Sequence, residues 1–146
     1  MEKETVAQSL KLYIVLSRAY KAINEHVNKS IQENGVNPTE FAVLELLYHK
    51  GDQPMQQIGN KILLASGSIT YVVDKLEQKG MLKRIACPKD RRVTYAQITE
   101  EGKQFIKDIF PNHENQIHGL MSALDESEKA EAIELLKKLG LEAEKF

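Results

Sequence analysis

The sequence has one cysteine, Cys87, in 146 residues. One cysteine cannot form a disulfide within the chain, and its scarcity is typical of proteins from a reducing compartment. No apolar run approaches the roughly 20 residues that a membrane-spanning helix needs, so no membrane partner is expected. The first residues, "MEKETVAQ", are acidic where a secretory signal peptide is basic. We therefore expect a cytoplasmic protein.

Motifs of catalysis are lacking as well. The sequence contains no Gly-rich phosphate loop, no nucleophile elbow and no paired carboxylates in a recognisable setting. Its histidines are scattered, and none forms a compact set with the cysteine or a carboxylate at metal-ligand spacing. The sequence therefore predicts neither an enzyme nor a protein with a metal or cofactor. The histidines are His26, His49, His113 and His118.

An excess of charge of one sign is also absent, since the formal net charge is −1. The charges are unevenly placed, however. Residues 74–92 contain seven bases and three acids, whereas residues 125–146 contain seven acids and four lysines. A nearly neutral chain with a basic middle can still present a cationic face to a polyanion.

Helical periodicity dominates what is present. In the first thirty or so residues, apolar side chains recur at spacings of three and four until Gly35, which predicts one long helix. A second apolar edge at Val6, Leu10 and Ile14 makes the stripe unusually wide. Such width indicates burial on more than one side, and a partner subunit is one source of it. The main stripe is Leu12, Leu16, Tyr20, Ile23, Val27 and Ile31.

Two short helices follow a second, well-marked helix. "NPTEF" combines a capping Asn37, a proline at the first helical position and Glu40 three residues after the cap, and the helix ends at Gly51. A third helix begins near Pro54 and is interrupted by "LLAS", and a fourth ends at Gly80. Two short helices joined by a turn of about four residues have the dimensions of a helix-turn-helix.

The periodicity then changes to that of strands. "MLKRIA" and "VTYAQI" predict a two-stranded hairpin, and Thr99 caps the helix after it. Pro111 should kink or end that helix, and Asp125 with Glu128 opens a last helix that Gly140 ends. The order predicts a mainly α fold with a small β-hairpin wing, that is, a winged helix-turn-helix with long terminal helices. The expected regions are 1–36, 37–100 and 101–146.

Three motifs in and after the fourth helix carry a family resemblance. "VDKLEQKGMLKR", then "DRR", then "ITEEG" at these spacings resemble the MarR family of bacterial transcription regulators, and the match is densest from Asn37 to Gly102. The resemblance implies a homodimer formed by the terminal regions 1–36 and 101–146, bound to an inverted-repeat operator in double-stranded DNA, usually as a repressor. It also implies release by a small phenolic or aromatic effector or by cysteine oxidation. Within the family, "CPKDRR" is most similar to regulators that sense organic peroxides, quinones or phenols.

The fourth helix is the natural recognition helix. Its first turns, "SGSITY", are small or polar, and none of these side chains would block entry into a major groove about 12 Å wide. Hydroxyls at a helix N-terminus also suit phosphate. The alternative is that Ser66 is only an N-cap and that Ser68 and Thr70 are merely solvated. The candidate DNA contacts here are Ser66, Gly67, Ser68, Thr70, Tyr71 and Lys75.

The wing tip, "CPKDRR", has more cations than a turn needs. A guanidinium suits a narrow, electronegative minor groove, and Arg92 is the first candidate for insertion. The resemblance implies that Asp90 pairs with Arg92 and that Arg91 or Lys89 contacts phosphate. Arg84 on the first strand is a further phosphate candidate. The alternative is a hairpin tip that is simply soluble.

The sequence contains two candidate sites for sensing an effector. Cations around Cys87 should favour its thiolate, which makes it a candidate redox sensor. The family's peroxide sensors usually carry the reactive cysteine in the N-terminal helix, where this chain has none, so a passive Cys87 is the alternative. A small aromatic effector could bind where the first, second and fifth helices meet. The alternative is core packing, which is the usual role of aromatic side chains at helical spacing. The candidate pocket residues are Tyr13, Tyr20, Phe41 and Phe105.

A second function class is a winged-helix adaptor that binds protein without binding DNA. The basic wing argues for DNA. An affinity whose logarithm falls steeply with the logarithm of salt concentration would identify DNA binding. Binding to a protein partner that salt does not weaken would identify the adaptor.

Overall fold

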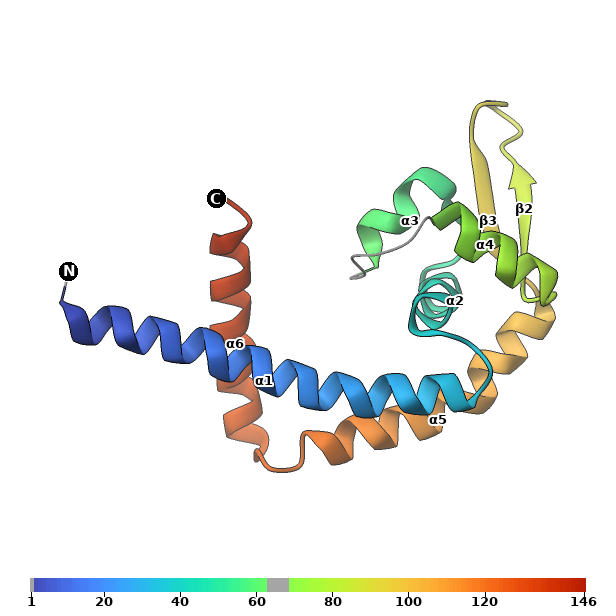
Figure 1. Cartoon of the computed structure of the whole chain (residues 1–146). Coiled ribbons are helices and arrows are strands. Elements are labelled where there is room, and N and C mark those ends of the chain that lie inside the picture. Colours follow the sequence, from blue (N-terminus) through green and yellow to red (C-terminus); the bar gives the residue numbers. More distant parts are fainter. Residues whose placement is uncertain (1, 63–68) are drawn as a thin grey trace. The chain divides into compact units, whose positions relative to one another are not determined.

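The structure is a computed structural model that describes residues 2–62 and 69–146. Two compact units divide the chain, Met1–His113 and Glu114–Phe146. The second unit contains the end of α5 and all of α6 (Glu126–Ala143). The first unit contains α1 (Lys3–Glu33), α2 (Pro38–Lys50), β1 (Gln53–Pro54), α3 (Met55–Lys61), α4 (Ile69–Gln78), β2 (Leu82–Ala86), β3 (Thr94–Ile98) and the first part of α5 (Glu100–Leu120) (Figure 1).

The junction between α1 and α2 forms as the sequence predicts. The chain leaves α1 through Gly35, whose φ of 89° lies in the region that glycine adopts without strain. Asn37 then caps α2: its Oδ1 accepts from the backbone N of Glu40 at 2.8 Å, and Glu40 Oε1 accepts from the backbone N of Asn37 at 3.0 Å. This reciprocal capping box confirms the predicted helix start.

The sheet has one strand more than predicted. β1 pairs antiparallel with β3, so the strand order is β1-β3-β2 rather than a two-stranded hairpin. Two residues are too few to produce an alternating pattern in the sequence, and Pro54 argues against a strand. Proline is tolerated here because β1 lies at the edge of the sheet.

The core of the first unit joins α2, α3, α4, α5 and the sheet. Val72, Val73 and Leu76 of α4 are buried and form its inward face. Thr70, Tyr71 and Lys75 are exposed on the rest of α4. The largest fully buried side chains are Leu44, Leu47, Ile58, Leu76, Leu82, Ile106, Val43 and Val73.

Two helices run past positions where the sequence allowed an end. Pro111, predicted to kink or end its helix, lies inside α5 and does not end it, because the proline is exposed and the carbonyl it leaves unbonded belongs to the exposed Lys107, where water can serve. α6 continues past Gly140 to Ala143, since a glycine inside a helix costs only about 1 kcal/mol. Thr99, in contrast, caps α5 as predicted, with its Oγ1 accepting from the backbone N of Gly102 at 3.1 Å.

Both terminal helices expose apolar side chains. On α1 the exposed fraction is 61% for Leu10 and 70% for Tyr13, and on α6 it is 50% for Ile133 and Leu136. None of the helices in residues 2–62 and 69–146 combines the length and apolarity that crossing a membrane requires.

Candidate nucleic-acid interface

The outer face of α4 carries three of the predicted DNA contacts. Thr70, Tyr71 and Lys75 are exposed, and the Lys75 Nζ lies 5.5 Å from the centroid of the Tyr71 ring. The four-residue spacing brings these two side chains together on one helix face, where the ring face attracts the cation. The predicted contacts Ser66, Gly67 and Ser68 lie outside the residues that the structure describes.

At the wing tip, Arg92 pairs with Asp90. Asp90 Oδ1 accepts from the backbone N of Arg92 at 3.0 Å and from its Nε at 3.1 Å, and Asp90 Oδ2 accepts from Nη2 at 3.2 Å. The turn itself is closed by the backbone N of Val93, which donates to the Asp90 carbonyl at 3.1 Å, and by that of Cys87, which donates to the Val93 carbonyl at 3.0 Å. The structure thus contains the Asp90–Arg92 pair, and the Arg92 side chain remains 90% exposed.

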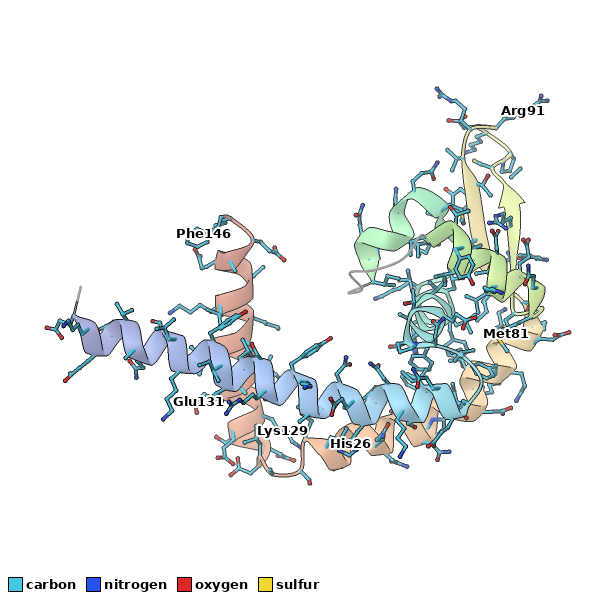
Figure 2. The ribbon with its side chains drawn as sticks, in the orientation of Figure 1. His26, Met81, Arg91, Lys129, Glu131 and Phe146 are labelled. Atoms are coloured by element: carbon cyan, nitrogen blue, oxygen red, sulfur yellow. The ribbon has the colours of Figure 1, made fainter. Side chains whose placement is uncertain are left out.

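Electrostatics keep this tip cationic. The hydrogen bonds from Arg92 lower the pKa of the Asp90 carboxyl below its ordinary value, so that Asp90 is ionised and balances one guanidinium. Lys89 and Arg91 are exposed beside the pair and leave the tip with a net positive charge. Arg91 extends outward from the end of the hairpin (Figure 2).

Arg84 has other partners than the sequence suggests. Its Nη2 lies 2.5 Å from Asp74 Oδ1 and its Nη1 lies 2.5 Å from Glu77 Oε1, so the guanidinium joins β2 to α4. The hydrogen bond to Asp74 is the main cause of the raised pKa of Arg84. Sequence reasoning gave Asp74 and Glu77 no role. Their spacing of three residues, which places both carboxylates on one side of a helix, is the signal that could have found them.

Cys87 lies at the first residue of the wing turn, with a free and half-buried thiol. It is close in sequence to the cations of the tip, but its backbone N–H is used by the turn.

A cavity of about 450 Å³ lies among α1, α2, the end of α3 and the start of the second half of α5. Tyr20 and Phe41 line it, as the sequence suggests. Tyr13 does not, because it lies two turns earlier on α1 and is exposed, and Phe105 instead packs against the core. The other lining residues are Asn24, Val27, Asn28, Ile31, Pro38, Ala42, Glu45, Leu46, His49, Lys50, Lys61, Ile62 and His113.

Two histidines that looked scattered in the sequence belong to this cavity wall. His113 of α5 lies with its ring 4.9 Å from that of Phe41, and His49 of α2 lies 5.0 Å from Phe110, measured between ring centroids. The rings of Phe110 and His113 are 5.7 Å apart. Sequence spacing could not show the contacts of Phe41 with His113 and of His49 with Phe110, because they join α2 to α5.

A helix with an open polar face beside a cationic hairpin defines a winged-helix protein. The MarR family model matches residues 36–94. The chain is 66% identical over 139 residues to the HTH-type transcriptional regulator MhqR of Bacillus subtilis, covering 95% of this chain and 96% of that relative. It is 46% identical over 142 residues to the uncharacterized HTH-type transcriptional regulator YkoM of the same organism, covering 97% and 92%. The chain therefore belongs to the MarR family, whose relatives are transcriptional regulators and not enzymes.

Solved structures share the fold. The MarR family transcriptional regulator Sco3205 of Streptomyces coelicolor, crystallised in complex with DNA, matches with a TM-score of 0.83 and 18% identity, covering 92% of this chain and 86% of the other. The predicted fold class, mainly α with a small wing, is confirmed.

Proposed function

We propose that this protein is a dimeric, sequence-specific DNA-binding regulator, a repressor released by a small phenolic or quinone ligand or by modification of its thiol. One observation carries the DNA-binding part: Arg92 is 90% exposed at the tip of the hairpin, and Asp90 fixes its guanidinium through both carboxylate oxygens. A fixed, solvated guanidinium on a narrow turn is suited to a minor groove. The fold shared with Sco3205, crystallised with DNA, supports this use of the wing.

In this proposal α4 enters the major groove beside the wing. Thr70, Tyr71 and Lys75 face the bases or phosphates there, together with the predicted contacts Ser66 to Ser68. Lys89 and Arg91 bind phosphate and orient the protein without reading sequence. Cations that displace counterions from the duplex give binding its dependence on salt.

In the proposed dimer, the interface buries apolar side chains of the terminal helices. Apolar side chains such as Leu10 of α1 and Leu136 of α6 are at least half exposed in one chain, and contiguous exposed apolar surface marks interaction sites. A two-fold symmetric pair would place its two α4 helices about 34 Å apart, which matches the half-sites of an inverted repeat. The assignment of 1–36 and 101–146 to dimerisation belongs to this proposal.

Release by a ligand is supported by the cavity. A volume of about 450 Å³ lined by Tyr20, Phe41, His49 and His113 suits a single aromatic ring, with imidazole nitrogens available to a phenolic hydroxyl or a quinone oxygen. Cys87 offers the second route, because an adduct on its thiol would disturb the turn that holds Asp90 and Arg92. In both cases DNA is released because the wing or α4 no longer fits the duplex.

The proposal is tested by comparing Arg92→Ala with Lys107→Ala, which removes one exposed cation from α5. Duplexes selected from a random pool serve as the operator, and affinity is measured by fluorescence anisotropy over a salt series. We expect Arg92→Ala to bind about tenfold or more weakly, with its dimer intact, and Lys107→Ala to bind within about twofold of the parent. Equal affinity for Arg92→Ala removes the wing from the interface. A parent that binds no duplex, and binds a protein partner independently of salt, identifies the adaptor instead.

A further inference from the structure

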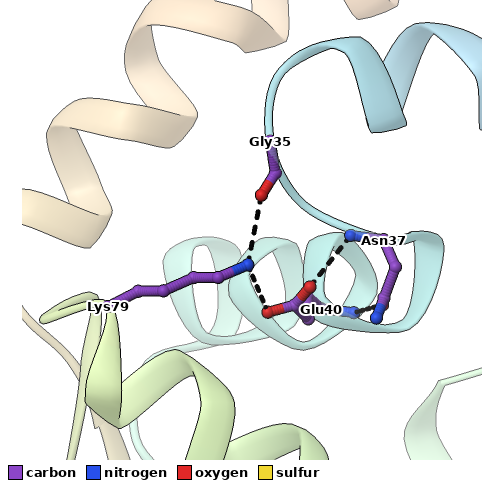
Figure 3. A network of polar contacts seen from close by, with 4 residues as sticks. All are labelled: Gly35, Asn37, Glu40 and Lys79. Atoms are coloured by element: carbon purple, nitrogen blue, oxygen red, sulfur yellow. Dashed lines mark hydrogen bonds and ion pairs between the residues drawn. The ribbon is translucent and has the colours of Figure 1, made fainter.

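Lys79, the residue directly after α4, reaches a distant part of the chain. Its Nζ lies 2.8 Å from Glu40 Oε2 and donates to the carbonyl of Gly35 at 3.1 Å (Figure 3). These partners are 39 and 44 positions away in the sequence. The ammonium thus joins the end of α4 to the turn between α1 and α2.

The Glu40 carboxylate is nearly closed off from water. Its side chain is 6% exposed, whereas that of Lys79 is 35% exposed. One of its oxygens serves the capping box of α2 and the other serves Lys79. A buried carboxylate is strongly disfavoured without a partner, so Lys79 has a fixed position to occupy.

Both ends of this contact lie next to turns that follow a helix. The backbone N of Lys79 donates to the Lys75 carbonyl at 3.1 Å, which continues the hydrogen-bonding of α4, and Gly80, with a φ of 77°, then turns the chain toward β2. A cation at this end also suits the helix dipole. On the other side, Gly35 lies between the last residue of α1 and the cap of α2.

We propose that Glu40 and Lys79 form a latch that sets the angle of α4 against the α1–α2 turn, and that Lys79 is a positioning residue rather than a DNA contact. The inference rests on the proposed function. The same junction borders the cavity, since Ile31, Pro38 and Phe41 line it. A ligand that moves α1 against α2 would therefore move the anchor of α4, and would shift the protein toward a form in which α4 is misaligned for DNA.

Substitutions can separate this role from a phosphate contact. Lys79→Met keeps the aliphatic stem and removes the charge, Lys79→Arg restores a cation, and Lys107→Met is the matched control on α5. Glu40→Gln removes the charge from the other side while keeping a side chain able to complete the capping box. Circular dichroism and size-exclusion chromatography confirm that each variant is folded and assembled as the parent.

For DNA binding, we expect Lys79→Met and Glu40→Gln to bind the selected duplex about tenfold more weakly, with the slope of log affinity against log salt unchanged. Lys79→Arg should recover most of the affinity. Loss of a phosphate contact would instead lower the slope by about one. Parental affinity in Lys79→Met, or a lowered slope, overturns the latch.

A second measurement needs no DNA. Nitroxide spin labels are attached to cysteines introduced by Lys29→Cys on α1 and Thr70→Cys on α4, in a Cys87→Ser background. The labelled protein is diluted with excess unlabelled protein, so that the measured distances are those within one chain. The distance distribution should broaden in Lys79→Met and narrow again in Lys79→Arg. An unchanged distribution in Lys79→Met overturns the latch. If the parent binds no duplex, the proposed function fails, while this distribution still decides the latch.

Discussion

Arg84 of β2 donates from Nη2 to Asp74 Oδ1 of α4 at 2.5 Å, and Nη1 of the same guanidinium donates to Glu77 Oε1. The sequence suggests that Arg84 binds phosphate, but this geometry gives it a second way to promote DNA binding. It pairs with two carboxylates on the helix proposed to enter the major groove and offsets one of their two negative charges. Removing Arg84 would leave both acids unpaired on α4.

We therefore predict that Arg84→Ala lowers DNA affinity, and that Asp74→Asn with Glu77→Gln added to it restores most of the loss. The restoration is expected because neutral amides no longer repel phosphate. Anisotropy titrations of the parent, the single variant and the triple variant at one salt concentration make the comparison. Failure of the triple variant to recover would mean that the guanidinium itself contacts the duplex.

For the Asp90–Arg92 pair we predict a change in DNA affinity opposite to the one that net charge alone would give. Asp90→Asn removes one negative charge from the wing, which by itself should strengthen binding to DNA. We expect about a tenfold loss instead, because an amide cannot accept from Arg92 with both of its atoms and the guanidinium is no longer fixed. Asp108→Asn on α5 makes the same change of charge far from the wing in sequence. Tighter binding by Asp90→Asn would show that orientation of Arg92 is unimportant.

The pH dependence of this pair has a definite sign. Because pairing with Arg92 lowers the pKa of Asp90 in the folded protein, the pair is complete above the ordinary aspartate value of about 3.9 and is lost only as the pH falls through the lowered value. The ¹⁵N chemical shift of Arg92 Nε should thus be constant from about pH 8 to pH 5. A shift that titrates near neutral pH would contradict the assignment.

Features encoded by neighbouring residues could be predicted from the sequence. The capping boxes at Asn37 and Asp125 and the cap at Thr99 each depend on residues three positions apart, and all are present. Burial of one face of α4 likewise follows from helical spacing. Local signals therefore sufficed for the order of the helices and of the two hairpin strands.

Contacts between distant segments could not be predicted. Glu40 and Lys79 each have ordinary local explanations, as a capping residue and a solvated lysine, and their pairing depends on how α2 packs against α4. β1 exists only because β3 offers it an edge, and His49 and His113 meet the same cavity from different helices. The Asp90–Arg92 pair was predicted because the family resemblance implied it, and a spacing of two residues allows the contact.

Gly102, within the "ITEEG" motif, has a packing role that the motif alone does not explain. A Cβ at this position would overlap the Met81 carbonyl oxygen and lie 2.7 Å from Ile98 Cγ1. That carbonyl cannot easily move, since it accepts from the backbone N of Thr99 at 3.0 Å. We predict that Gly102→Ala lowers the free energy of unfolding by about 1–3 kcal/mol in urea denaturation.

Gly119 of α5 is the matched control. A Cβ there would meet nothing within 4 Å, so Gly119→Ala should leave stability unchanged or raise it by up to about 1 kcal/mol. The two variants are compared at one protein concentration, because assembly contributes to apparent stability. Equal stability of Gly102→Ala and Gly119→Ala would contradict the close approach of Gly102 to Met81.

The proposed dimer interface is tested on α6. Leu136 is 50% exposed in one chain, and a glutamate there would introduce a charge into apolar surface that the partner covers. We predict that Leu136→Glu sediments as a monomer at concentrations where the parent is a dimer, and that it loses affinity for the inverted repeat. Lys138→Glu, on the polar side of the same helix, should remain dimeric. A dimeric Leu136→Glu would place the interface elsewhere.

The two release routes can be told apart with Cys87→Ser and Tyr20→Ala. The Cys87 thiol can form a covalent adduct with a quinone, whereas a plain phenol can act only by occupying the cavity that Tyr20 lines. We predict that Cys87→Ser needs a higher concentration of the quinone for release, because only occupation of the cavity remains, and that it responds normally to the phenol. Tyr20→Ala should need about tenfold more phenol, because it loses an aromatic contact, while its affinity for DNA without ligand is unchanged. Anisotropy competition with both compounds measures this, and a Cys87→Ser protein released by the quinone at the parent's concentration would remove the thiol from the mechanism.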